Sequence, residues 1–175
     1  MGTYISQLFT YRNNIYRLLM ATIVFTTALI NVPDVNAENK ITRPVIIYKS
    51  PDCGCCGAWV DHIEAAGFST KIQHPENLNK IKEQLDISPM YQACHTAVTQ
   101  GYVFEGHIPA EVIQHFINFK PDATGLSVPG MPLGSPGMET DKKFRSYEIL
   151  QLNKDGASTP YARVSSSEID YLNKK

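Results

Sequence analysis

Three of the four cysteines in this 175-residue chain stand within four residues, in the run Ser50–Gly57 (SPDCGCCG). The short β-branched and aromatic run Val45–Tyr48 comes just before them, and its length and composition indicate a buried strand. Trp59, Val60 and Ile63 follow at the spacing of one apolar helix face. We therefore expect the cysteines to occupy a strand-to-helix turn, a position that fixes the order of the elements around it.

The spacing of the three cysteines allows two kinds of chemistry. Cys53 and Cys56 form a C-x-x-C pair, and Cys55 lies between them. A helix N-terminus presents free N–H groups and a positive dipole end, so it favours a thiolate over a thiol. A thiolate is both the nucleophile of disulfide exchange and a soft metal ligand. The motif alone is compatible with a redox pair and with a metal site.

The N-terminus predicts export. Two arginines precede the uncharged, mostly apolar run Leu18–Ile30, and the small residue Ala37 offers a cleavage position. This layout is typical of a secretory signal peptide, which we place at residues 1–37. An uncleaved N-terminal anchor is the alternative. After cleavage the mature chain, Glu38–Lys175, is expected to form a single domain.

Composition limits the classes of partner that the chain can bind and the roles that its four cysteines can have. The mature chain keeps 14 basic and 16 acidic residues, with no clustered basic face for nucleic acid or for a membrane surface. In an oxidising compartment four cysteines can form two structural disulfides. The neighbours Cys55 and Cys56 can pair with each other only through a strained ring, which argues against that simple account.

The rest of the chain predicts a mixed α/β domain. We expect strands at 45–48, 68–72, 93–99 and 102–105, and helices at 55–66, 78–85 and from 109. A Pro/Gly-rich loop at 121–137, hairpin strands at 147–152 and 161–164, and a short helix or frayed end from 165 follow. The order β-α-β-α-β-β-α, with cysteines at the first strand-to-helix turn, is that of a thioredoxin-like three-layer sandwich with a mixed sheet, here with a C-terminal β-hairpin and the Pro/Gly-rich loop added. This topology would bring Cys94 to the other cysteines.

Two features favour a metal site over a redox pair. An additional cysteine inside a C-x-x-C motif invites unwanted pairing during exchange, and Cys94 supplies a fourth sulfur. Thiolates select soft ions, chiefly Cu(I), with Zn(II) as the competitor. Because Cys55 and Cys56 are adjacent, they are expected to bridge several Cu(I) ions more easily than to close on one tetrahedral ion.

Histidines and methionines near the cysteines are weaker candidates. Strand alternation places His95 on the opposite face from Cys94, as a buried or supporting residue rather than a ligand. For His107, orienting a ligand and bonding to the backbone both stay open. Met131 and Met138, in the Pro/Gly-rich loop, carry thioethers that suit Cu(I), although two loop methionines are also ordinary. We expect Met90 to be in the core.

Four ordered motifs carry a family resemblance, and they are Tyr48–Cys56, Ala93–Ala97, Tyr102 with Glu105–Pro109, and Gly125–Pro132. Over about residues 44–164 the chain resembles the CopG-type copper-resistance proteins, first catalogued as a domain of unknown function. The resemblance implies a thioredoxin-like fold, export to the bacterial periplasm, and copper binding through Cys53, Cys55, Cys56 and Cys94. It does not say whether copper is stored, delivered or changed in oxidation state.

The leading prediction is a periplasmic copper-binding protein of metal resistance that holds Cu(I) on the four-cysteine site, with copper redox chemistry as an open addition. Its partners would be copper ions and other periplasmic copper-handling proteins, with no nucleic acid and no membrane after signal cleavage. The alternative is a thiol–disulfide oxidoreductase that uses Cys53 and Cys56. A module stapled by structural disulfides ranks third.

Overall fold

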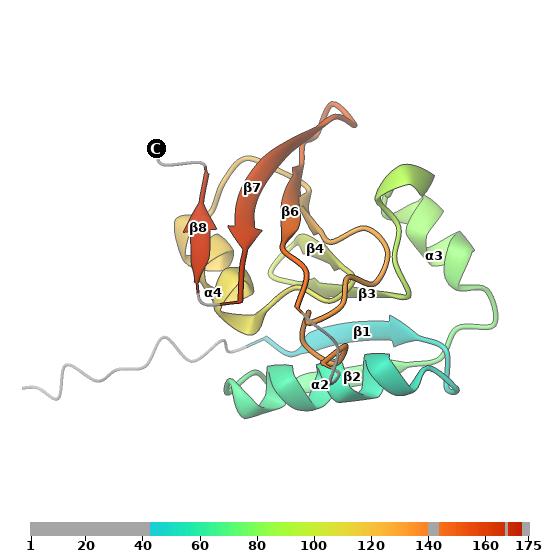
Figure 1. Cartoon of the computed structure of the whole chain (residues 1–175). Helices are drawn as coiled ribbons and strands as arrows, with labels where there is room; N and C mark the ends of the chain where they lie inside the picture. The colour runs from blue at the N-terminus through green and yellow to red at the C-terminus, as the bar shows by residue number, and fades with distance from the viewer. Residues whose placement is uncertain (1–42, 140–143, 167, 173–175) are drawn as a thin grey trace, which may run out of the picture. The chain divides into compact units, whose positions relative to one another are not determined.

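A computed structural model describes residues 43–139, 144–166 and 168–172, all within one compact unit, Lys40–Lys175. The predicted signal peptide lies outside these residues. The described part is a mixed α/β structure, as the sequence predicts, and Figure 1 shows its arrangement. No helix in this part is both long and apolar enough to cross a membrane.

Eight strands and three α-helices make up the described part of the chain. The strands are β1 (Val45–Lys49), β2 (Thr70–Gln73), β3 (His95–Thr99), β4 (Tyr102–Glu105), β5 (Gly125–Ser127), β6 (Tyr147–Leu152), β7 (Ser158–Val164) and β8 (Ile169–Tyr171). The helices are α2 (Gly54–Ala65), α3 (Leu78–Gln84) and α4 (Ala110–Phe119), with a 3-10 turn at Pro89–Tyr91. The strands form one sheet in the order β2-β1-β3-β4-β5-β6-β7-β8. Parallel pairs join β1 to β2 and β4 to β5, and the other pairs are antiparallel.

Helix α2 forms where the sequence predicts a helix after the cysteines. Trp59, Val60 and Ile63 are buried on one face, which is the apolar stripe of the sequence. The helix ends before Gly67, whose φ of 91° is a left-handed conformation that glycine adopts at little cost. The Gly67 N–H donates to the carbonyl of Glu64 at 2.9 Å and so closes the last turn.

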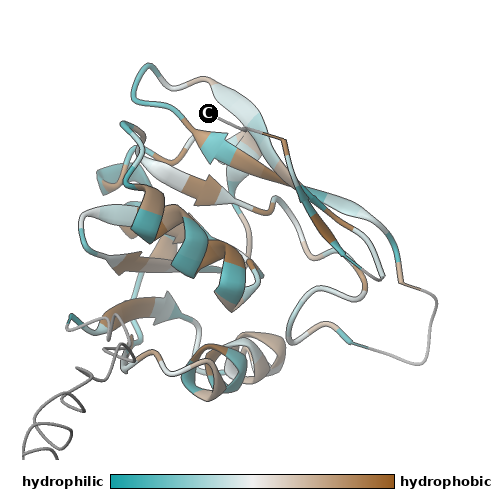
Figure 2. Ribbon diagram, turned by 90° about the vertical axis from the view of Figure 1, so that its left-hand side faces the viewer, coloured by the Kyte–Doolittle hydropathy of each residue, from teal (hydrophilic) through white to brown (hydrophobic). Residues whose placement is uncertain are grey.

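Helices cover both faces of the sheet. Ala97 of β3 and Phe104 of β4 are paired and fully buried, and they share one core with apolar side chains of α2 and α4. The next pair, Thr96 and Glu105, points to the other face because side chains alternate along a strand. Lys82 of α3 bonds to both of them there, so α3 packs on that face. In Figure 2 the helices are striped in hydrophilic and hydrophobic colours, as expected for elements with one buried face.

Two strands depart from the sequence prediction. β5 lies inside the predicted loop, where Gly125 packs so closely on β4 that an added Cβ would lie 1.7 Å from the Val103 carbonyl oxygen. The chain end, expected to be a short helix or frayed, instead forms β8 from Ile169, paired antiparallel with β7. That expectation was wrong because three residues carry too little periodicity to identify an edge strand.

Two side chains are placed against expectation near the cysteines. Met90, predicted to be in the core, is 69% exposed in the 3-10 turn that precedes Cys94. Conversely, the buried residue of α3 is Lys82, while its apolar residues Leu78 and Ile81 are only half-buried. Tertiary pairing decides the burial of this lysine, and helical periodicity does not reveal it.

Candidate metal centre

The first three cysteines are positioned by the start of α2. Cys53 is the N-cap residue, with extended φ and ψ of −80° and 95°, and its carbonyl accepts the Gly57 N–H at 3.2 Å. Cys55 and Cys56 follow in the first turn. The C-x-x-C pair, Cys53 and Cys56, forms a disulfide in this structure, and Cys55 keeps a free, half-buried thiol. Cys56 is fully buried.

The fourth cysteine comes from another part of the fold. Cys94 is the residue before β3, which pairs antiparallel with β1, the strand that leads into the cysteine turn. The four sulfur atoms, those of Cys53, Cys55, Cys56 and Cys94, all lie within 4.8 Å of one another. The sheet therefore brings together the four cysteines that the sequence singles out. Four sulfurs at this spacing form a donor set that suits a soft ion once the disulfide is reduced.

His107 contacts Cys94 directly. Its Nε2 lies 3.0 Å from the Cys94 sulfur, and its Nδ1 lies 2.7 Å from the carbonyl oxygen of Pro136. A carbonyl oxygen only accepts hydrogen bonds, so Nδ1 carries the proton and Nε2 of the neutral ring is left as an acceptor. Of the two roles that the sequence left open for His107, bonding to the backbone is confirmed, and orienting a ligand stays a prediction.

Burial keeps this pair uncharged. It raises the pKa of the Cys94 thiol to about 12, with the nearby Cys55 as the next cause. Burial also lowers the pKa of His107. At neutral pH the Cys94 S–H therefore donates to His107 Nε2. A soft ion that takes the sulfur must displace this proton, and the imidazole nitrogen lies where it can receive it.

His95 is buried between the sulfur atoms and the core. It is fully buried and packs on Trp59 of α2, with ring centroids 4.2 Å apart. Its Nδ1 lies 3.5 Å from the Cys94 sulfur, and burial holds its pKa well below the usual value. A second group of potential ligand atoms within 4.8 Å of one another consists of Cys56, Cys94, His95 and His107. The ring is thus a supporting neighbour of Cys94, with the geometry to be a ligand too.

Gly106 fixes the backbone beside these residues. Its N–H donates to the His95 carbonyl at 3.0 Å, and its φ is 80°. A Cβ on Gly106 would lie 2.5 Å from the Val128 carbonyl oxygen and 2.7 Å from the Ala93 Cβ. A side chain at this position would force apart the segments that carry Cys94 and the Pro/Gly-rich loop.

The Pro/Gly-rich loop packs against the start of α2. A Cβ on Gly137, whose φ is 80°, would lie 2.6 Å from the Cys55 carbonyl oxygen and 2.8 Å from the Trp59 nitrogen. The next residue, Met138, is half-buried, whereas Met131 is 52% exposed. The loop thus contacts the cysteine turn at Gly137, and Met138 is the next residue in the sequence.

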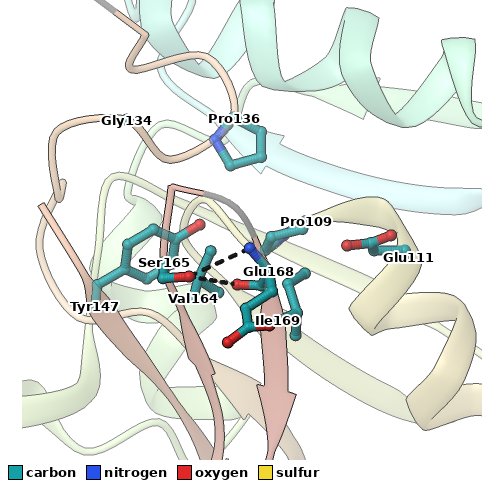
Figure 3. A pocket seen from close by; sticks show the side chains of 9 residues that line it. All are labelled: Pro109, Glu111, Gly134, Pro136, Tyr147, Val164, Ser165, Glu168 and Ile169. Atoms are coloured by element: carbon teal, nitrogen blue, oxygen red, sulfur yellow. Dashed lines mark hydrogen bonds between the residues drawn. The ribbon is translucent and has the colours of Figure 1, made fainter. Parts of the chain in front are cut away.

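A pocket of about 250 Å³ is lined in part by Gly134 and Pro136 of the same loop. Pro136, whose carbonyl binds His107, forms part of its wall, together with Glu111 and Tyr147 (Figure 3). The Tyr147 hydroxyl is buried and has no hydrogen-bond partner among the described residues. None of the cysteines lines this pocket, so it is separate from the sulfur cluster.

Sequence reasoning missed the contacts of His107 with Cys94 and with Pro136. The contact between His107 and Cys94 spans 13 residues, and no periodicity links them. The available signal was the segment Glu105–Pro109, in which a histidine stands between a strand and a proline that opens a helix. The bond to Pro136 has no counterpart in the sequence pattern.

Comparisons with known proteins give one family model and two solved structures. A family model described as a protein of unknown function, DUF411, matches residues 91–138, which include Cys94, His107 and Met138. Two solved structures match the chain, and both are described as the copper resistance protein CopG. Form 2 is 33% identical and covers 70% of this chain and 100% of that chain, and form 1 is 32% identical and covers 70% and 98%, each with a TM-score of 0.66. No curated protein matches the chain.

Proposed function

The chain belongs to the CopG family of copper-resistance proteins, and from this we propose that it binds Cu(I) in the periplasm through its four-cysteine site. A copper-related role follows from the family and from the sulfur cluster. The proposed ligands are Cys53, Cys55, Cys56 and Cys94. The observation that carries the proposal is that these four sulfurs lie within 4.8 Å of one another.

Softness and crowding support Cu(I) as the bound species. Thiolate sulfur binds Cu(I) in preference to hard ions, and crowded thiolates can bridge more than one such ion. Cys55 and Cys56 are adjacent in the first turn of α2, so bridging suits them better than closing on a single ion. Cys53 and Cys56 become available only after their disulfide takes up two electrons and two protons.

We also infer a thioredoxin-like fold and export to the periplasm. The cysteine turn between β1 and α2, and helices on both faces of the sheet, support the fold assignment. The predicted signal peptide supports export. Cleavage of this segment is tested by mass spectrometry of the protein recovered from a periplasmic extract.

The main test is the copper content of anaerobically reduced protein. We expect the parent to bind more than one Cu(I) per chain and to protect all four thiols from alkylation. Cys94→Ser should lose tight uptake, whereas Met90→Leu, at an exposed position that keeps every cysteine, should bind as the parent does. A single ion per chain with all four thiols protected would exclude the bridged cluster. Unchanged binding by Cys94→Ser would exclude the four-cysteine site.

A second candidate function is thiol–disulfide or copper redox chemistry. The disulfide between Cys53 and Cys56 favours it, because it joins the C-x-x-C pair at a helix N-terminus with Cys56 buried behind Cys53. Oxidation of the two thiols to the disulfide releases two electrons and two protons, enough to reduce two Cu(II) to two Cu(I).

Two assays separate the redox activities. With copper chelated, a thiol–disulfide oxidoreductase should accelerate the reduction of insulin, and Cys53→Ser should abolish this. In the copper reaction, reduced protein mixed with Cu(II) should yield two Cu(I) for each Cys53–Cys56 disulfide formed. If Cu(I) appears without loss of thiols, the disulfide is not its electron source.

A further inference from the structure

A buried ion pair lies directly beneath the Cys94 segment. Lys82 of α3 and Glu105 of β4 form a salt bridge, with 2% and 0% of their side chains exposed. Both residue types are almost never fully buried unless paired. Replacing a buried ion pair by apolar residues of similar volume often leaves a protein equally or more stable. Stability alone therefore does not account for a lysine and a glutamate here.

The Glu105 carboxylate accepts hydrogen bonds from three donors. They are the ammonium of Lys82, the hydroxyl of Thr96 at 2.6 Å and the backbone N–H of Ala93 at 2.7 Å. The Thr96 hydroxyl in turn accepts from Lys82 at 2.9 Å. Because these three groups are donors, the carboxylate is ionised. Burial raises the pKa of Glu105, and the nearby Lys82 ammonium acts in the opposite direction. Among the described residues, the one backbone group that bonds to these side chains is the Ala93 N–H.

Ala93 needs this contact because no strand ladder reaches it. β3 begins at His95, so Ala93 and Cys94 lie outside the regular pairing. Ala93 directly precedes Cys94. Its N–H instead donates to the Glu105 carboxylate. The Cys94 sulfur itself contacts His107 Nε2 at 3.0 Å. The backbone before Cys94 is thus held by a side chain.

We propose that the Lys82–Glu105 pair is a positioning device for the Cys94 thiol. Glu105 holds the Ala93 N–H, and Lys82 keeps Glu105 charged and in place. Neither residue is among the proposed ligands. The inference rests on the proposed copper site, because it gives a reason for the exact placement of its fourth sulfur.

Two double variants separate positioning from folding. In Lys82→Met/Glu105→Gln the glutamine oxygen can still accept from the Ala93 N–H. In Lys82→Met/Glu105→Leu the pair becomes apolar and the acceptor is lost. We expect both variants to stay folded, since neither leaves an unpaired charge in the buried site, and urea titration checks this. The exposed pair of Lys154 and Asp122, changed to methionine and leucine, is the matched control.

The readouts are Cu(I) affinity, by competition with bicinchoninate, and the alkylation rate of Cys94 in metal-free protein. We expect the leucine variant to lose about 10- to 100-fold in affinity, the usual cost of removing a partner that orients a ligand. Its Cys94 alkylation rate should also change. The glutamine variant and the exposed control should stay close to the parent in both measurements.

Several outcomes would overturn the inference. One is a leucine variant that matches the parent in both readouts, and another is a glutamine variant that loses as much as the leucine variant. If the leucine variant does not fold, amide hydrogen exchange of the parent decides, and fast exchange at Ala93 refutes the bond. If the parent takes up no copper, the copper proposal fails, while the alkylation comparison still tests positioning.

Discussion

The two parts of the sulfur cluster are held in different ways. Cys53, Cys55 and Cys56 are placed by the first turn of one helix, and the disulfide between two of them spans only three residues. Cys94 contacts His107, 13 residues away, and the neighbouring Ala93 N–H donates to Glu105, 12 residues from Ala93. A site built on a local turn depends on the start of α2, whereas Cys94 depends on the packing of several segments. Substitutions around the two parts should therefore have unequal effects.

The largest effect is expected from Gly106→Ala, which breaks the long-range part. Its Cβ would meet the Val128 carbonyl and Ala93 at less than 3 Å, on a backbone with φ of 80°. Overpacking and left-handed strain together should cost roughly 3 kcal/mol in the free energy of unfolding, measured by urea titration. A loss below about 1 kcal/mol would mean that this junction adapts easily.

The next effect concerns the reactivity of Cys94. Only the thiolate form of a cysteine is alkylated, and burial raises the pKa of the Cys94 thiol to about 12. The thiolate fraction therefore rises tenfold with each pH unit below that value. Alkylation of Cys94 in metal-free protein should therefore accelerate about 100-fold from pH 7 to pH 9, followed by peptide mass spectrometry. A plateau in this range would show that the thiol ionises far more readily.

A smaller effect is expected in acid. The pKa of His107 is lowered in the folded state from 6.5, so below pH 6.5 the unfolded chain binds more protons than the folded chain. The stability present above pH 6.5 is lost as the pH falls through the folded pKa. His107→Gln removes this contribution, so its stability should fall less than that of the parent between pH 7 and pH 5. Equal slopes in the two urea series would contradict the shift.

The smallest effect tests the local part. Gly57 lies in α2, and a Cβ there would have no neighbour within 4 Å. Gly57→Ala should stabilise the protein by about 0.5 kcal/mol, because alanine loses less backbone freedom in a helix. It is also the control for Gly106→Ala, since the same substitution is expected to act with the opposite sign. A loss of stability at Gly57 would mean that the cysteine turn is as constrained as the Cys94 segment.

The same division explains what the sequence could predict. The strand, the cysteine turn and α2 follow from local patterns, and the order of elements was enough to expect Cys94 near the other cysteines. Local periodicity could not reveal that Lys82 is buried, because the reason is a partner on β4. Nor could it reveal β5, whose close approach to β4 depends on the missing side chain of Gly125.

Methionines show the limit from the other direction. Met90 is an apolar residue of a kind common in cores, but the 3-10 turn directs it to the surface. Met138 stands in a segment rich in proline and glycine, which predicts irregular backbone and says nothing of order. The residue before it, Gly137, lets the loop approach the backbone of α2.

The remote origin of Cys94 also links metal content to the folded state. An unfolded chain offers three neighbouring sulfurs, but it meets the fourth only by closing a long loop, which costs chain entropy. An ion that uses Cys94 together with the cysteines of α2 therefore binds the folded chain more tightly than the unfolded one. By mass action such an ion raises the unfolding temperature in proportion to the logarithm of its free concentration. The protein would then be most stable where the ion that it binds is most abundant.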